Sequence, residues 1–168
     1  QLYLKGRYYW NKRNAESLSK AGDYFNQAIV RDPSYALAYS GLADSYMLIP
    51  EYGGGPAREF YPKAEAAARK ALELDDALAD AHTSLGEVSA YQWKWNEAEK
   101  EFLRAIELNP NYATAHQWYS ETPLLATGRF EEANREMKRA LELDPLSLII
   151  HASLGVDYQS GRRYDEAI

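Results

Sequence analysis

The chain has 168 residues, of which 46% are hydrophobic and 26% are charged, as in an ordinary globular protein. Its net charge of −6 disfavours a nucleic-acid-binding surface, because phosphate recognition requires clustered Lys and Arg. No apolar run approaches the roughly 20 residues of a membrane span, and the absence of cysteine excludes disulfides and thiolate metal sites. We therefore expect no membrane insertion, no cofactor, no metal and a reducing, cytoplasmic location.

A helix end, a turn and a new helix follow one another four times along the sequence. The turns are marked by Pro33, Asp76, Pro110 and Pro145, which are separated by 43, 34 and 35 residues. Apolar residues between the turns recur at intervals of three and four, as in FLRAIEL (102–108), which indicates helices and not strands. The sequence predicts one domain of antiparallel helix pairs at about 1–35, 36–78, 79–112 and 113–147, followed by a partial pair at 148–168.

Two pairs depart from the regular period. The second contains an insertion at 49–57, where three consecutive glycines predict a flexible loop. In the fourth pair, ETPLLATG holds one residue too many, and Pro123 lies where a helix should run. Because proline removes a backbone hydrogen bond and clashes with the preceding turn, we predict a kink or bulge near Tyr119–Pro123.

The final pair stops at Ile168, inside what should be its second helix. Repeat proteins normally end in a capping repeat with a polar outer face. We therefore expect the chain to be a fragment of a longer protein. The apolar surface of this incomplete C-terminal edge is a candidate surface for homo-oligomerisation.

The recurring positions carry a specific residue pattern. The third pair places His82, Leu85, Gly86, Ala98, Phe102, Ala105 and Pro110 at positions 4, 7, 8, 20, 24, 27 and 32 of a 34-residue unit. The other second helices repeat the spacing with Ala21, Phe25 and Ala28, with Ala64, Ala68 and Ala71, and with Ala133, Met137 and Ala140. This pattern resembles the tetratricopeptide repeat family over nearly the full chain. The resemblance implies an all-α, right-handed superhelical solenoid of antiparallel helix pairs.

The resemblance further implies a concave groove, lined by the first helix of each pair, that binds a protein or peptide. The residues it places there are Asp44, Met47, Asp80, Thr83, Glu87, Tyr91, Gln117, Trp118 and Glu121, with Tyr3, Arg7 and Trp10 in the first repeat. Asp44, Glu87 and Glu121 share one motif position and predict an acidic stripe beside aromatic rings. Such a stripe favours a basic partner with apolar anchors. The alternative interpretation is a solvated helix face that binds nothing.

Other candidate sites favour structural interpretations. His82, His116 and His151 share motif position 4, but neighbouring repeats lie about 10 Å apart, too far for three imidazoles to share one metal ion. We expect these imidazoles to pack between helices and, if buried, to destabilise the fold when acid protonates them. No phosphate loop or hydrolase motif occurs. The two tryptophans of WKWNEAEKEF (93–102) are better interpreted as packing residues than as a ligand cage.

The sequence therefore predicts a protein-binding or peptide-binding scaffold without catalytic activity. An alternative function is open at this stage. The phrases LYLKGRYYWNKR, YALAYSGLADSY and YATAHQWYSE are similar to tetratricopeptide regions of large prokaryotic signalling proteins. In those proteins the repeats accompany a transcriptional regulator, a Ser/Thr kinase or a nucleotide cyclase, and they transmit a signal or self-associate.

Overall fold

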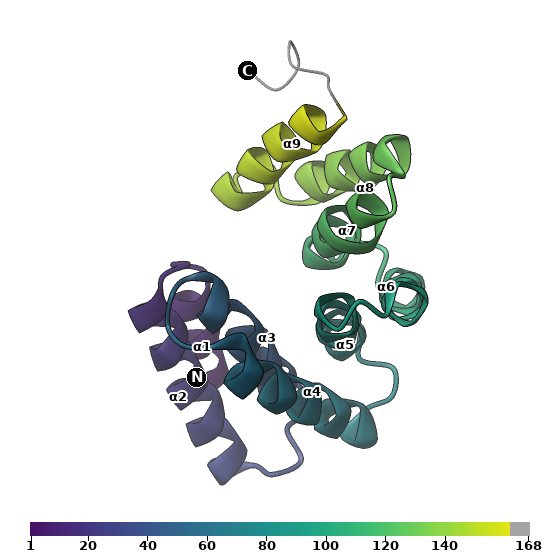
Figure 1. The fold of residues 1–168 in the computed structure, drawn as a ribbon. Coiled ribbons are helices and arrows are strands. Elements are labelled where there is room, and N and C mark those ends of the chain that lie inside the picture. The colour runs from purple at the N-terminus through teal and green to yellow at the C-terminus, as the bar shows by residue number, and fades with distance from the viewer. Residues whose placement is uncertain (162–168) are drawn as a thin grey trace.

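The computed structural model describes residues 1–161, which form an all-α chain (Figure 1). Each predicted repeat folds as a pair of helices joined by a short turn. The pairs are α1 (Leu2–Trp10) with α2 (Ala15–Arg31), α3 (Ala36–Glu51) with α4 (Ala57–Leu74), α5 (Ala79–Tyr91) with α6 (Trp95–Leu108), and α7 (Ala113–Tyr119) with α8 (Phe130–Leu143); α9 (Leu148–Ser160) begins a fifth pair.

The helix pairs follow one another along an arc that runs from α1 to α9 (Figure 1). The first helices contact each other in succession, α1 against α3, α3 against α5 and α5 against α7, and they form the inner layer. The second helices lie on the outside of this layer. The predicted all-α solenoid of antiparallel pairs is thereby confirmed. Within residues 1–161, no helix has the length and apolar character needed to cross a bilayer.

The turns between repeats are fixed by short polar side chains at the end of the second helices. The carboxylates of Asp32 and Asp75 and the amide oxygen of Asn109 each accept a hydrogen bond from the backbone N–H two residues later, at 3.0–3.1 Å. These local bonds compete with continuation of the helix and stabilise the turn. The recurring Asp or Asn before or at the turn therefore has a local structural cause.

The alanines and large residues that repeat along the second helices form the core. Every one of the twelve residues at these positions is buried, with 5% or less of its surface exposed: Ala21, Phe25, Ala28, Ala64, Ala68, Ala71, Ala98, Phe102, Ala105, Ala133, Met137 and Ala140. Alanine lets two helices approach closely, and the ring or thioether beside it fills the space that remains. These recurring residues thus form a packed layer between the helices.

Phe25 shows how tightly the first helices approach. A Cβ atom added at Gly6 of α1 or at Gly41 of α3 would lie 2.5 or 2.6 Å from the Phe25 ring. No real side chain is tolerated at that distance, so both positions require glycine for the ring to sit between α1 and α3. Gly22 is different, because a Cβ atom there would meet Leu42 at 3.7 Å, an ordinary contact distance.

The insertion predicted at 49–57 takes a different form from the expected loop. Helix α3 continues through Pro50 to Glu51, and the connection is limited to Tyr52–Pro56. Pro50 is accommodated because it is the next-to-last residue of α3, so most of the helix precedes it. The glycines supply the turn itself, since Gly53 has φ +76° and Gly55 has φ +155°.

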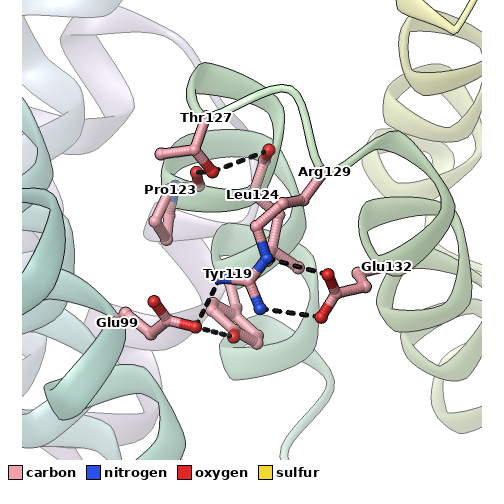
Figure 2. A network of polar contacts seen from close by, with 7 residues as sticks. All are labelled: Glu99, Tyr119, Pro123, Leu124, Thr127, Arg129 and Glu132. Carbon is pink, nitrogen blue, oxygen red and sulfur yellow. Dashed lines mark hydrogen bonds and ion pairs between the residues drawn. The ribbon is translucent and has the colours of Figure 1, made fainter.

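The bulge predicted near Tyr119–Pro123 is confirmed as a π-helical turn at Ser120–Leu124 that interrupts the fourth repeat. The extra residue is absorbed by the wider turn, which also accommodates the missing N–H of Pro123. Figure 2 shows the contacts around it. The Thr127 hydroxyl donates to the Pro123 carbonyl at 2.6 Å, and Tyr119 donates to Glu99 of α6 at 2.8 Å.

Arg129 joins this bulge to two helices (Figure 2). Its Nη1 lies 2.6 Å from Glu99 of α6, and its Nε and Nη2 donate to the two carboxylate oxygens of Glu132 at 2.8 and 2.7 Å. A forked pair of this kind fixes the guanidinium in one orientation. The side chain of Arg129 therefore ties α6 to α8 beside the bulge.

The second helix that the sequence predicts for the partial fifth repeat would involve residues 162–168, which lie outside the described residues. The same is true of part of the C-terminal edge for which the sequence predicts self-association.

The glycine contacts generate a matched prediction. We expect Gly41→Ala to lower the free energy of unfolding by about 1–2 kcal/mol, because overpacking against Phe25 outweighs the gain in helix propensity. Gly22→Ala should instead raise it by about 0.5–1 kcal/mol, since the methyl group has room. Urea unfolding of the two variants measures both values. Equal effects of the two substitutions would contradict the close approach at Phe25.

Candidate functional site

The inner wall, built by α1, α3, α5 and α7, holds the residues predicted to line the groove. Most of the side chains predicted to line an open groove are buried. Met47 and Thr83 are fully enclosed, and Asp44, Glu87, Gln117 and Trp118 have 4% or less of their surface exposed. Asp80 and Glu121 are partly exposed, and only Tyr91 has an exposed ring. Most of these side chains therefore face neighbouring helices of the same chain.

Asp44 is neutralised from within the chain. Arg7 of α1 donates from Nη1 to its Oδ2 at 3.0 Å, and Ser84 of α5 donates to its Oδ1 at 2.6 Å. Burial raises the pKa of Asp44, while the Arg7 guanidinium and the Ser84 hydroxyl oppose that rise. The first member of the predicted acidic stripe is thus a structural ion pair that ties three inner helices together.

An aromatic and cationic cluster lies over the same wall. The Arg7 and Arg13 guanidinium carbons lie 4.2 and 3.7 Å from the Trp10 ring centroid, and Trp10 meets Trp118 of α7 at 6.4 Å between ring centroids. Both indoles are buried. The positive charge and apolar anchor that the sequence predicts for a partner are here supplied by the first repeat. The structure thus buries Asp44 and Glu87, two of the three residues of the predicted acidic stripe.

Glu87 remains without a cation. Its carboxylate is buried and accepts one hydrogen bond, from the Thr122 hydroxyl at 3.2 Å. Burial raises the pKa of Glu87 well above its ordinary value, and the negative charges of Glu121 and Glu51 add to the rise. The ion pairs within residues 1–161 include none of these three glutamates. No guanidinium or ammonium group of residues 1–161 therefore pairs directly with these carboxylates.

Two openings among residues 1–161 are each lined in part by α7 or by the bulge that follows it. The first, the α1–α9 opening, has a volume of about 540 Å³ and lies between the α1–α2 turn and the start of α9. Arg7, Arg13, Gln117, Leu146 and Leu148 are among its lining residues. It combines a cationic side with an apolar side.

We term the second opening the tryptophan pocket, and its volume is about 270 Å³. It lies between the last residues of α5, the first residue of α6 and the bulge after α7. It is lined by Ala90, Tyr91, Trp93, Trp95, Glu121, Thr122 and Ala126. The interpretation of Trp93 as a packing residue is wrong, because this side chain is 78% exposed. The two predicted groove residues Tyr91 and Glu121, which keep part of their surface accessible, belong to this pocket.

The histidines at motif position 4 act as structural bridges. His82 and His116 each place Nδ1 2.6 Å from a glutamate of the following helix, Glu101 or Glu136. Their Nε2 atoms lie 3.1 Å from a carbonyl of the preceding turn, and His151 makes the same carbonyl contact through its Nε2. No group of three or more metal-ligating side chains occurs among residues 1–161.

The expected acid sensitivity of these imidazoles is wrong for His82. An imidazolium can donate from both nitrogens, whereas a neutral ring can donate from only one. The hydrogen bond to Glu101 accordingly raises the pKa of His82, against the effect of burial. Protonation of this side chain stabilises the fold, and that contribution is lost as the pH rises through the folded-state pKa.

Comparison with known proteins supports the repeat architecture. Residues 79–112 match the family model described as Tetratricopeptide repeat. No curated protein sequence matches the chain. Among solved structures, YrrB, described as a TPR protein with an unusual peptide-binding site, is 25% identical. Its alignment covers 91% of this chain and 74% of that one, with a TM-score of 0.55.

Two further structures share the fold over most of their length. A thermophilic TPR protein of Thermus thermophilus is 20% identical, with 86% of this chain and 78% of that chain covered and a TM-score of 0.68. PilF of Pseudomonas aeruginosa is 20% identical, with 99% and 70% covered and a TM-score of 0.65. At this level of identity the likeness concerns the fold alone.

The Arg7–Asp44 pair yields a stability prediction. Arg7→Met should lower the free energy of unfolding by about 3 kcal/mol, because it leaves a buried carboxylate without its cation. The double variant Arg7→Met/Asp44→Asn should recover more than half of that loss, since the charge is removed together with its partner. Chemical unfolding of both variants measures the coupling. A double variant as unstable as Arg7→Met alone would contradict the pair.

Glu87 yields a pH prediction. A carboxyl group whose pKa is raised by folding stabilises the folded state below its unfolded pKa of about 4.3, and the contribution is lost as the pH rises through the folded pKa. Glu87→Gln should therefore raise the free energy of unfolding at pH 7 and change it little near pH 4. Glutamine keeps an acceptor for Thr122. An effect of equal size at the two pH values would show that ionisation of Glu87 does not destabilise the folded state.

Proposed function

The chain is a solenoid of tetratricopeptide repeats, and we propose that it is a scaffold that binds an extended segment of a partner protein on its inner side. The observation that carries the proposal is the pair of openings beside α7, since most of the predicted groove residues elsewhere on the wall are buried. YrrB, which shares the fold, is described as having a peptide-binding site. Extended segments bind to preformed concave surfaces with little loss of receptor entropy.

The two openings suggest a division of contacts along the partner segment. Leu146 and Leu148, which are 88% and 82% exposed, offer apolar contacts in the α1–α9 opening. Glu121 offers a negative charge in the tryptophan pocket. Thr114 lines the first opening and Thr122 the second, which corresponds to about 12 Å along a helix, or about four residues of an extended peptide. In this proposal, the apolar anchors of the partner bind in the α1–α9 opening and its basic group binds in the tryptophan pocket.

The remaining predicted groove residues have a supporting role in this proposal. Asp44, Met47, Thr83, Glu87 and Trp118 are enclosed, so they position the inner helices and do not contact the ligand. Asp80 is partly buried, and burial raises its pKa. Gln117 is buried but lines the α1–α9 opening, where its amide also donates to Glu121 at 3.2 Å.

We propose a binding function and not catalysis. The carboxylates of the wall already accept structural hydrogen bonds, Asp44 from Arg7 and Ser84 and Glu87 from Thr122. The imidazoles of His82 and His116 are held by glutamates of the following second helices. These four side chains are therefore engaged in structural contacts within the chain.

A regulatory segment of a larger prokaryotic signalling protein is the second candidate function. The observation that favours it is the occupation of the wall by Arg7 and Trp10 of α1, because a ligand that displaced them would move the first repeat. Hydrogen exchange of the α1 amides with and without ligand separates the two functions. Unchanged exchange supports a passive scaffold and contradicts signal transmission through α1.

The scaffold proposal is tested by selection from a displayed library of random peptides. We expect selected peptides to bind wild type and to bind Thr114→Trp at least about tenfold more weakly, a change of about 1.4 kcal/mol, because the indole fills the α1–α9 opening. Gln27→Trp, on the exposed face of α2 away from both openings, is the matched control and should bind as wild type does. Peptides that bind wild type and Thr114→Trp with equal affinity would refute this site.

A further inference from the structure

The tryptophan pocket contains an aromatic side chain that packing does not explain. Trp93 is 78% exposed, and its backbone has a φ of +62°. The corresponding turns of the second and fourth repeats place Gly53 and Gly128 in this left-handed conformation, at φ +76° and +75°. Glycine adopts the conformation without strain, whereas a residue with a Cβ atom does so at a cost. The third repeat thus keeps an indole at the rim of the pocket where the backbone favours glycine.

The pocket presents aromatic rings beside carboxylates. Trp93 and Trp95 meet edge to face with ring centroids 5.4 Å apart, and Tyr91 forms a third part of the wall. The Tyr91 hydroxyl donates to Glu51, and Glu121 lines the pocket directly. Glu87 lies behind Thr122, which donates to it at 3.2 Å. Rings next to carboxylates attract a flat cation.

Elsewhere on the inner wall, a guanidinium group of the chain itself already binds an indole ring and a carboxylate. There the guanidinium of Arg7 lies over the Trp10 ring at 4.2 Å and donates to the Asp44 carboxylate at 3.0 Å. Asp44 and Glu121 share one motif position in their repeats. In the tryptophan pocket, the indoles and the carboxylate are present, and no arginine is among the lining residues that the structure describes.

We propose that the tryptophan pocket binds the guanidinium group of an arginine side chain from the partner segment. The guanidinium stacks on Trp93 and Trp95 and donates to the Glu121 carboxylate. Arginine is preferred over lysine because its planar group is more weakly hydrated, stacks on rings and donates along a fork. This inference rests on the proposed scaffold function and specifies which side chain of the partner is recognised.

The test uses a capped peptide, acetyl-Gly-Ser-Arg-Ser-Gly-amide, and its counterpart in which neutral citrulline replaces arginine. Citrulline preserves the shape and removes the charge. In ¹H–¹⁵N spectra we expect saturable shifts of the Trp93 and Trp95 indole signals with the arginine peptide. Binding of the citrulline peptide should be weaker by at least about fivefold. The buried indoles of Trp10 and Trp118 should remain unshifted.

Three variants complete the test. Trp93→Gly and Glu121→Gln should each weaken arginine-peptide binding by about fivefold or more. Tyr8→Ala removes an exposed ring of α1 outside the pocket and should have no effect. Trp93→Gly should unfold at a temperature no lower than wild type, because glycine suits the left-handed turn, so weaker binding will not reflect misfolding.

The outcomes separate this inference from the scaffold function. Equal binding of the arginine and citrulline peptides, or undiminished binding by Trp93→Gly, overturns the arginine site. Library peptides that are sensitive to Thr114→Trp but insensitive to Trp93→Gly also overturn it, while leaving the scaffold function in place. An arginine-specific shift at Trp93 supports the site even if the library yields no peptide, in which case the scaffold proposal fails.

Discussion

The close approach of the inner helices is the constraint on which the rest of the structure depends. Alanines recur along the second helices, and Gly6 and Gly41 allow the Phe25 ring to sit between α1 and α3. Helices that approach so closely leave little room between neighbouring repeats. On the inner side, Trp10 at the end of α1 meets Trp118 of α7, far along the chain. Small residues in the core thereby determine how much of the inner surface is left to a ligand.

Burial changes the electrostatics of the inner wall. An exposed carboxylate is solvated by water, whereas a buried one needs a cation or hydrogen bonds. Asp44 obtains both, from Arg7 and Ser84, while Glu87 receives only the hydroxyl of Thr122. One motif position thus carries a neutralised acid in the second repeat and an uncompensated one in the third. The asymmetry along the wall comes from α1, which lies beside the second repeat.

The turns between paired helices connect the repeat architecture to the two openings. The turns within the first four pairs each hold a residue in the left-handed conformation, and two of them place Arg13 and Trp93 there in place of glycine. Arg13 lies over the Trp10 ring, and Trp93 forms the rim of a pocket. Backbone strain of this kind persists where the surrounding structure holds it. The side chains that depart from the repeat pattern therefore lie beside the two openings.

The sequence by itself determined the fold class, the helix pairs, the buried alanine and aromatic positions, and the bulge at Pro123, because each depends on spacing within or between neighbouring repeats. It also named Tyr91 and Glu121, which line the tryptophan pocket. Only the tertiary structure decided which wall residues meet water. The contact of Trp10 with Trp118 depends on the accumulated rotation of several repeats, which no local pattern encodes. The exposure of Trp93 could not be predicted for a similar reason, since a tryptophan beside a helix start is usually packed, and its environment is set by the bulge of the next repeat.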